Sequence, residues 1–298
     1  MATTMFYRRK VILALLEVFG GKLHAINLQK ILFMVSNKQS KPVYEFIPYK
    51  YGCFSYSATA DLVAMVKHGF VTEDENVYAK KDRLNYLPSL NEADRKLVNQ
   101  VYLLYRNYDA DALMKHTYLH FPYYAINSMA APRLLDEQQL SIVKAKRPIG
   151  KNTTLYTIGY EGVSLEAYLN KLILNDIKVL VDVRNNPLSQ KYGFSKSQLV
   201  RYCGNLGIEY VHIAEVGVIS SDRQQLKEQK DYDVLFDAYN KNTIPNTLPA
   251  QERILNILIE KQRIALTCFE ANICQCHRKH LSEAITRLQR WKYELKHI

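Results

Sequence analysis

The chain has 298 residues, of which 48% are hydrophobic and 23% are charged, so it can bury apolar cores and lacks the composition of a disordered protein. At roughly 150 residues per domain, this length predicts two domains. The 40 basic and 29 acidic side chains give a formal net charge of +11, and five cysteines are too few for a disulfide scaffold, which favours a reducing, cytoplasmic location.

The N-terminal segment carries basic residues before an apolar stretch, as secretory signals do. Glu17 interrupts that stretch and no small-residue cleavage site follows, so we expect residues 8–19 to be a helix of the folded protein. No uncharged apolar run approaches the roughly 20 residues that span a bilayer. We therefore expect no membrane partner.

Residues 1–145 are predicted to form a mostly helical domain. Apolar residues at helical spacing predict helices over 8–19, 27–36, 57–67 and 91–107. One or two short strands are predicted over 70–80. Three helices followed by short strands are compatible with a winged-helix arrangement.

Residues 153–298 have a different pattern, in which apolar strands alternate with helices, and a linker over 140–152 is expected to precede them. Strands are predicted at 154–158, 178–183, 209–213 and 263–268. Helices are predicted at 164–175, 195–206, 249–262 and 279–296, and near 231–240 within an irregular region over 214–248. Continuous apolar strands imply a parallel sheet covered on both faces, so the predicted fold class is α/β.

Basic and aromatic residues occur together in the N-terminal half. Thirteen of the 22 tyrosines precede residue 150, and the net charge there is +7, against +4 in the remainder. Basic side chains attract phosphates and aromatic rings stack on bases. We therefore expect a nucleic-acid partner, with DNA favoured, and the residues expected to bind it are Arg8, Arg9, Lys50 and Tyr51.

Polar residues follow three of the predicted strands. In an open parallel sheet, ligands bind beyond the carboxyl ends of the strands, where Glu161, Asp182 and Glu270 would gather. Strand alternation places Asp182 and Arg184 on the same side, within reach of each other or of a ligand. The three acidic residues are therefore our candidate catalytic residues.

The loop over 268–278 admits several interpretations, two of which use its cysteines. Cys268, Cys274, Cys276 and His277 would supply a Cys3His zinc site, although their spacing differs from the usual ligand motifs and adjacent residues are awkward to aim at one ion. Alternatively, Cys276 would be a nucleophile, with its pKa lowered by the dipole of the helix that follows. Neighbouring residues at a helix start usually point apart, which disfavours both.

The interpretation that we prefer is an anion-binding floor. The start of the last helix presents unpaired N–H groups, and Arg278 would clamp a phosphate or carboxylate there. Glu270 or Glu161 would act above it as general base or nucleophile. This interpretation needs no metal and no cofactor. The remaining alternative is structural, with cysteines packed as small apolar groups and Arg278 paired with Glu270 or Asp182.

Seven motifs in the second half, in this order, resemble the domain-of-unknown-function 488 family: Thr157-Ile-Gly-Tyr-Glu-Gly162, Val181-Asp-Val-Arg184, Asn186-Pro-Leu-Ser189, Gly193-Phe-Ser-Lys196, Gly207-Ile-Glu-Tyr210, Cys268-Phe-Glu270 and Cys276-His-Arg278. The resemblance covers nearly all of 153–290 and implies an α/β sandwich with these motifs clustered. One departure is Val216-Gly217-Val218, where relatives often carry a Leu-Gly-Gly-like turn. Besides the three acidic residues, the site residues expected to bind substrate are Tyr160, Arg184, Asn186, Ser189, Cys276, His277 and Arg278.

Residues 1–75 are similar to the antitoxin-associated Panacea domain. The similarity rests on Leu28-Gln-Lys-Ile-Leu-Phe33 and on Tyr49-Lys-Tyr-Gly-Cys-Phe-Ser55, followed by a helix and Gly69. It implies a regulatory, partner-binding or DNA-associated role for this part of the chain.

Two functions from different classes follow. The first is an enzyme, a hydrolase or glycosidase, that acts on a nucleotide or on modified or damaged nucleic acid at a glycosidic or phosphate-linked centre. The resemblance alone suggests a role in DNA repair or defence. The alternative is a non-catalytic, DNA-binding or antitoxin-like regulator whose α/β domain senses a small phosphorylated ligand. The sequence leaves open whether the chain forms a homo-oligomer.

Overall fold

The computed structural model describes residues 5–219 and 228–298. The chain forms two compact units, Met1–Arg147 and Pro148–Ile298, each built around its own hydrophobic core. Within the described ranges, no helix combines the length and apolarity that crossing a membrane requires.

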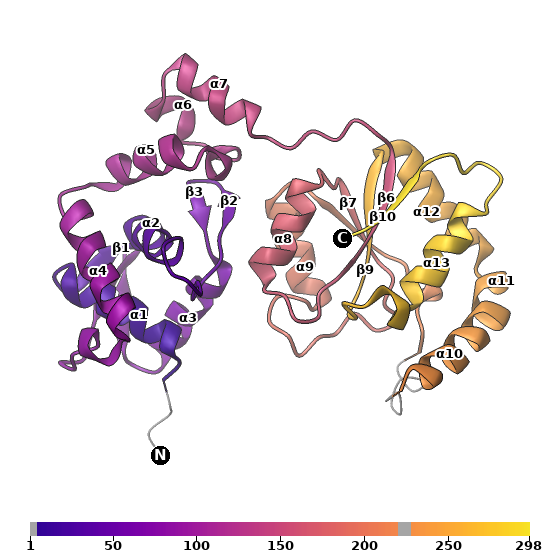
Figure 1. Cartoon of the computed structure of the whole chain (residues 1–298), viewed down its shortest axis with the longest axis horizontal. Helices are drawn as coiled ribbons and strands as arrows, with labels where there is room; N and C mark the ends of the chain where they lie inside the picture. Colours follow the sequence, from indigo (N-terminus) through magenta and orange to yellow (C-terminus); the bar gives the residue numbers. More distant parts are fainter. Residues whose placement is uncertain (1–4, 220–227) are drawn as a thin grey trace. The chain divides into compact units, whose positions relative to one another are not determined.

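The N-terminal unit is mostly helical, and its first part alternates helices with very short strands (Figure 1). In chain order the elements are α1 (Tyr7–Val18), β1 (Lys22–His24), α2 (Ala25–Ser36), β2 (Ile47–Tyr49), β3 (Gly52–Phe54), α3 (Tyr56–Lys67), β4 (Val71–Asp74) and β5 (Val77–Lys80). Strands β1, β5 and β4 form an antiparallel sheet in that order, whereas β2 and β3 pair as a separate hairpin between α2 and α3. Strand β1, between the first two helices, was absent from the sequence-based prediction.

The rest of this unit contains helices that the sequence pattern only partly predicts. They are α4 (Glu92–Tyr105), α5 (Ala110–His120), α6 (Ala131–Leu134) and α7 (Glu137–Ala145). Asp109 and Asp136 cap α5 and α7, because each side chain accepts a hydrogen bond from an N–H of the first turn. Helix α7 occupies the start of the segment predicted as linker, and the boundary between the units follows it at residues 147 and 148.

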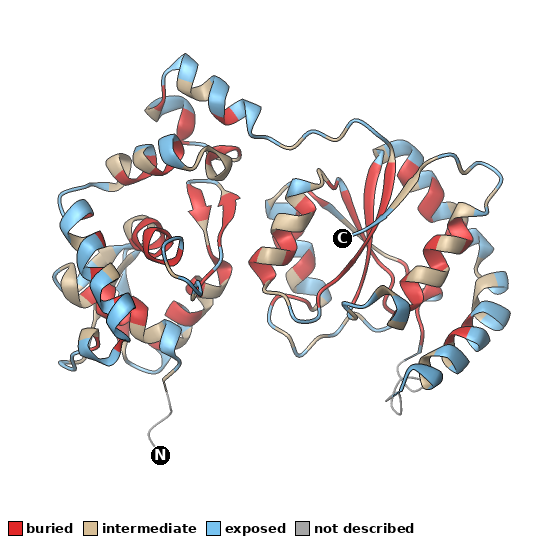
Figure 2. Ribbon diagram, in the orientation of Figure 1, coloured by how far each residue is buried: buried red, intermediate tan, exposed pale blue. Residues whose placement is uncertain are grey.

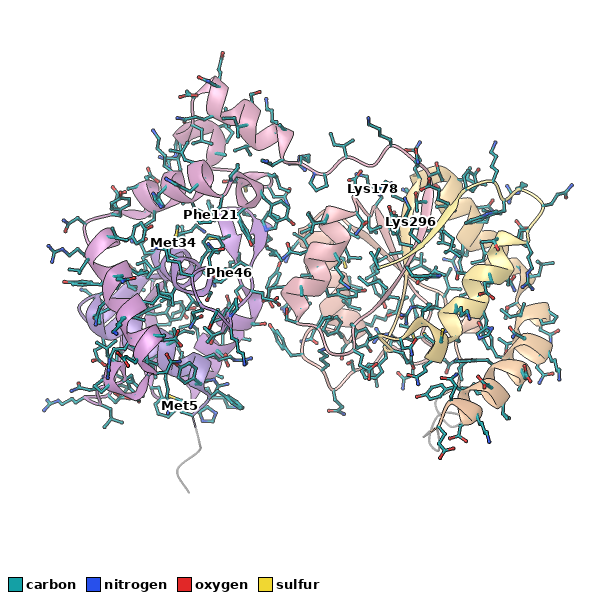
Figure 3. All side chains as sticks on the ribbon, in the orientation of Figure 1. Met5, Met34, Phe46, Phe121, Lys178 and Lys296 are labelled. Carbon is teal, nitrogen blue, oxygen red and sulfur yellow. The ribbon has the colours of Figure 1, made fainter. Side chains whose placement is uncertain are left out.

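The core of the N-terminal unit lies around α2, nine of whose twelve residues are buried. The ring of Phe33 makes edge-to-face contacts with Phe46, Phe121 and Tyr124, with centroids 4.7–5.2 Å apart. Figure 3 shows Met34, Phe46 and Phe121 inside this unit. Aromatic packing therefore joins α2 to the segments that precede β2 and follow α5.

The C-terminal unit is an α/β domain with a parallel sheet, as predicted, although the sheet has five strands and not the four that were predicted. Its elements are β6 (Thr154–Gly159), α8 (Leu165–Leu174), β7 (Val179–Asp182), α9 (Lys196–Asn205), β8 (Glu209–His212), α10 (Gln229–Ala238), α11 (Ile244–Asn246), α12 (Leu248–Lys261), β9 (Arg263–Cys268), α13 (His277–Thr286) and β10 (Glu294–His297). The strand order is β10-β6-β9-β7-β8. Every residue of β6, β7 and β9 is buried, which matches their continuous apolar sequences (Figure 2).

The end of the chain differs from the prediction. We expected one helix over 279–296, but α13 ends at Thr286 and β10 adds an edge strand beside β6. Trp291, Tyr293 and Leu295 recur at every second residue and pack against the core, which is strand rather than helix spacing. The prediction was wrong because it continued the helical pattern of residues 279–288 to residue 296, although the spacing of the apolar residues changes after residue 288.

The strand order in the sheet differs from the order along the chain, and this difference places the site. Strand β9 follows β6, β7 and β8 in sequence but lies between β6 and β7 in the sheet. Helices α8 and α9 cover one face of the sheet, whereas α12 and α13 cover the other (Figure 1). The loops that leave β6 and β7 therefore lead to one face, and the loop that leaves β9, the strand between them, leads to the opposite face. In open α/β sheets, such a point leaves a crevice outside the carboxyl ends of the strands.

Candidate functional site

A cavity of about 610 Å³ lies at this crevice. Its volume falls in the range of small-molecule sites in proteins. Six of the residues predicted from sequence line it: Tyr160, Glu161, Arg184, Asn186, Ser189 and Glu270. The cavity also has walls that the sequence motifs did not single out, among them Asn185, Lys191 and Gln275.

The loops after β6 and β9 are hydrogen-bonded to one another, which brings Glu161 and Glu270 to the same cavity. The backbone N–H groups of Tyr160 and Glu161 both donate to the carbonyl of Phe269, at 3.0 and 2.8 Å. The Ala271 N–H in turn donates to Glu161 Oε2 at 2.9 Å. The convergence of separate loops that the strand ends predict is therefore present in the structure.

Gly159 permits this close approach. A Cβ at this position would lie 2.0 Å from the carbonyl oxygen of Glu270, well inside van der Waals contact. Because a backbone atom cannot move away as a flexible side chain can, the last residue of β6 has to be glycine for the two loops to meet.

Asp182 and Arg184 form a buried ion pair behind the cavity wall. Arg184 Nη2 lies 2.5 Å from Asp182 Oδ2, and Arg184 Nε donates to the same carboxylate. Tyr210 Oη donates to Asp182 Oδ2 at 2.6 Å. Burial lowers the pKa of Arg184, but its hydrogen bonds to Asp182 outweigh that effect and leave the pKa above its usual value. The guanidinium is thus held as a permanent cation by its neighbours.

The remaining hydrogen bonds of Arg184 go to residues at one side of the cavity. Nη1 donates to Tyr160 Oη at 2.6 Å and to the carbonyl of Phe194 at 3.0 Å. The rings of Tyr160 and Phe194 stack with centroids 4.3 Å apart. Arg184 lines the cavity with only 6% of its surface exposed, so its main contacts are to the protein itself. Its expected role in substrate binding stays a prediction.

Lys191 contributes a cation to the same wall. Its ammonium group donates to the carbonyl of Tyr160 at 2.6 Å. Partial burial lowers the pKa of Lys191, and the nearby Glu161 carboxylate opposes that shift. Sequence reasoning missed this residue because one lysine in a polar loop has no distinguishing spacing; the only signal was its position between two motifs.

Cys276, His277 and Arg278 are buried at the start of α13 and are not among the residues that line the cavity. Cys276 is the N-cap and His277 is the first helical residue. Arg278 donates from Nη1 to the carbonyl of Glu270 at 2.6 Å and from Nη2 to that of Ala271 at 3.3 Å. These residues support the loop that carries Glu270, and their direct contact with a substrate stays a prediction.

The sequence-based expectation for the Cys276 pKa was wrong. We expected the helix dipole to lower it, but complete burial raises the pKa of this thiol well above its usual value, and Cys268 raises it further. At this buried helix N-terminus, the cost of removing a thiolate from water outweighs any stabilisation by the helix dipole. Without a further cation, Cys276 is therefore a protonated thiol at neutral pH.

Three groups able to ligate a metal lie together beside the cavity, and one of them, Cys268, lines it. The ligand atoms of Cys268, Cys276 and His277 are all within 4.8 Å of one another, and all three residues are buried. Cys274, which the zinc alternative would have included, is exposed. The objection that adjacent Cys276 and His277 would point apart was wrong. The N-cap has extended backbone, at φ −133° and ψ 133°, while the next residue is helical, so both side chains face the same point.

The N-terminal residues expected to bind nucleic acid fall into two groups. Arg8 and Arg9 both pair with Asp61 of α3, at 2.5 and 2.7 Å. Lys50 and Tyr51 are exposed at the turn between β2 and β3. The arginines thus hold α1 against α3, whereas the hairpin turn presents a lysine and an aromatic ring to solvent.

Comparison with known proteins agrees with the C-terminal resemblance. Residues 164–285 match the model of a family described as domain of unknown function DUF488. The match runs from the start of α8 to the end of α13 and so contains Asp182, Arg184 and Glu270. No curated protein and no solved structure matches the chain.

Proposed function

We propose that the C-terminal unit is an enzyme that acts on a nucleotide, free or within a modified or damaged nucleic acid, at a glycosidic or phosphate-linked centre. The observation that carries this proposal is the 610 Å³ cavity at the carboxyl edge of the sheet, with Glu161 and Glu270 both on its wall. A cavity of this size accommodates a nucleotide, and its mixed lining offers amide, hydroxyl and carboxylate groups.

Two carboxylates in one cavity can divide the work of acid–base or nucleophilic catalysis. Glu161 is oriented by the Ala271 N–H, and Glu270 lies beside the thiol of Cys268. Lys191 places a positive charge near Glu161, suitable for a phosphate or for charge that develops on a leaving group. One glutamate would act as base or nucleophile, and the lysine would hold the phosphate.

In this proposal Asp182 does not contact the substrate and acts through Arg184. It fixes Arg184, which in turn donates to the hydroxyl of Tyr160 on the cavity wall. Asp182 is therefore a positioning residue, and its replacement should disturb substrate binding and stability together.

The test uses the full chain with free nucleotides and with oligonucleotides that contain modified bases. Glu161→Gln and Glu270→Gln should each lower turnover by about a hundredfold or more while binding is retained, the usual loss for a general acid or base. Glu260→Gln, on the exposed surface of α12, is the matched control and should not change turnover. If both cavity variants keep the turnover of the parent protein, the carboxylates have no catalytic role and the proposal fails.

A second candidate is a nucleic-acid-binding regulator whose C-terminal cavity senses a phosphorylated ligand. Apart from the β2–β3 hairpin, which is inserted between α2 and α3, the elements follow the order α1-β1-α2-α3-β4-β5, with β1 paired to β5, and this order supports a winged-helix assignment. The candidate also draws on the Panacea resemblance of residues 1–75. The end of β4 and the turn that follows it carry Glu73, Asp74 and Glu75, which would repel phosphates. Contact with nucleic acid in this candidate therefore involves Lys50 and Tyr51 at the other hairpin.

Gel-shift measurements over a range of salt concentrations separate the two candidates. The regulator predicts binding without product, and Lys50→Ala should reduce the slope of log affinity against log salt by about 1. Lys115→Ala, exposed on α5, is the control. Product formation that depends on Glu161 or Glu270 would instead support the enzyme.

A further inference from the structure

We propose that Cys268, Cys276 and His277 bind a thiophilic divalent metal ion of the zinc class, with Glu270 as the fourth ligand. The site lies at the carboxyl end of β9 and the start of α13, and Cys268 and Glu270 also line the cavity. This inference does not depend on the proposed function, because it concerns occupancy by a metal and not turnover.

The distances fit a tetrahedral ion. Cys268 Sγ and Cys276 Sγ lie 3.7 and 4.0 Å from His277 Nδ1. With Zn–S bonds of about 2.3 Å and Zn–N bonds of about 2.0 Å, tetrahedral geometry requires S···N separations of roughly 3.6 Å. Both S···N separations are therefore within a few tenths of an ångström of those in a tetrahedral site, and the ligand atoms of all three residues lie within 4.8 Å of one another.

The histidine is oriented as a ligand. His277 Nε2 lies 3.0 Å from the carbonyl oxygen of Val183, which can only accept a hydrogen bond, so Nε2 carries the proton. In the neutral ring, Nδ1 then presents its lone pair toward both sulfur atoms. A hydrogen bond from the distal ring nitrogen to a backbone carbonyl is the usual support of a metal-binding histidine.

Glu270 completes the set from the cavity side. Its Oε2 accepts a hydrogen bond from Cys268 Sγ at 3.1 Å, so the carboxylate lies beside one of the three ligands. It is not part of the group whose ligand atoms all lie within 4.8 Å of one another, so it has to move toward Cys276 and His277 to bind the same ion. Two thiolates and one carboxylate carry three negative charges, which a divalent ion and the guanidinium of Arg278 would together neutralise. Arg278 follows the two ligands Cys276 and His277 in sequence, and its Nε is buried without a hydrogen-bond partner among the described residues. An anionic metal site beside it would account for this buried cation.

The experiment uses the full chain, reduced and freed of metal by a chelator, and titrates it with Co²⁺. One equivalent should bind, with the near-ultraviolet sulfur-to-cobalt charge-transfer band and the visible bands of a tetrahedral ion. Cys268→Ser and Cys276→Ser should each weaken binding at least a hundredfold. Glu270→Gln should weaken it about tenfold, because three ligands remain. Cys274→Ser, in the same loop but exposed, is the matched control and should bind as the parent protein does.

A measurement on the parent protein tests the proposal even if the variants fail to fold. X-ray absorption of the zinc-loaded parent protein should show two sulfur scatterers at about 2.3 Å and lighter ligands at about 2.0 Å. Added Zn²⁺ should also raise the melting temperature of the metal-free protein. Absence of stoichiometric binding by the reduced parent protein, a sulfur-free first shell, or equal loss of binding in Cys274→Ser would overturn the proposal. Metal binding without turnover would leave this inference intact and count against the proposed function alone.

Discussion

Arg184 and Asp182 are two residues apart in sequence and form an ion pair that is almost completely buried at the end of β7. Strand alternation puts both side chains on one side of the strand. Because both are buried, the charge of each side chain needs the other as its counterion. The pair connects the sheet to the cavity, because Arg184 also bonds Tyr160 and Phe194.

Removal of one partner should be costly. Arg184→Met leaves the Asp182 carboxylate buried without its counterion, and we expect the free energy of unfolding to fall by about 3–5 kcal/mol, measured by urea denaturation. The free energy of unfolding of the double variant Asp182→Asn, Arg184→Met should fall by less than that of Arg184→Met alone. Arg133→Met, which removes an exposed pair with Asp111, is the control and should change stability little. An equal loss in the double variant would show that the pair is not coupled.

Gly159→Ala should disturb the contact between the loops after β6 and β9. The new Cβ would meet the carbonyl of Glu270, so the backbone must move, at a cost of roughly 1–3 kcal/mol. Gly204→Ala is the matched control: it lies in α9 with open space around it and should leave stability unchanged or raise it by up to about 1 kcal/mol. Thermal unfolding of the two variants measures the contrast, and similar melting temperatures would contradict it.

Lys30 gives a pH dependence whose sign can be derived. Its ammonium group is buried in α2 and donates to the carbonyl of Cys53 at 2.9 Å. Pro48 lies opposite Cys53 in the hairpin and has no N–H that could donate to this carbonyl instead. Burial lowers the pKa of Lys30 below its usual 10.5. Between the lowered value and 10.5, the unfolded chain binds more protons than the folded one, so the stability contributed by Lys30 rises with pH.

We therefore expect the unfolding free energy of the parent protein to increase with pH relative to that of Lys30→Met. The relative slope should approach about 1.4 kcal/mol per pH unit within this window and vanish below it. Urea denaturation at a series of pH values up to 10.5 measures both proteins. Lys115→Met, an exposed substitution, should follow the parent curve; a Lys30→Met curve that also does so would rule out the shifted pKa.

The five cysteines should differ sharply in reactivity. Cys274 is exposed, whereas Cys53, Cys203, Cys268 and Cys276 are buried. Burial raises the pKa of Cys53 to about 11 and of Cys203 to about 12, so neither supplies thiolate at neutral pH. A thiol reagent should modify one cysteine rapidly in the reduced native protein and five after unfolding. Cys274→Ser should abolish the rapid phase, and a rapid phase that persists would locate a second accessible thiol.

The fold of the C-terminal unit was largely predictable from local pattern. Continuous, mostly apolar runs identified β6, β7 and β9 to within a residue or two, because these strands are buried on both faces. The position of β8 was also predicted to within a residue, although none of its residues is fully buried. The edge strand β10 was missed because it contains one apolar residue, Leu295, and because the alternating Trp291 and Tyr293 before it follow a helix without a clear stop. Its position became defined only when it paired with β6.

The candidate site was predictable in part. The rule that ligands bind at the carboxyl ends of parallel strands correctly brought Glu161 and Glu270 to one cavity. It did not show how deep each neighbouring side chain would lie. Arg184 and Arg278 were expected to clamp an anion, yet most of their hydrogen bonds go to Asp182 and to backbone carbonyls, since burial made those partners obligatory.

The sequence by itself determined the alternation of strands and helices in the second half, the helical character of the first, and the identity of the residues at the strand ends, because these follow from local periodicity and chain order. Only the tertiary structure decided which ends converge, which charges are neutralised internally, and that Cys276 and His277 face Cys268. Those outcomes depend on strand order, on loop contacts such as that of Gly159 with Glu270, and on exclusion of water, none of which a local pattern contains.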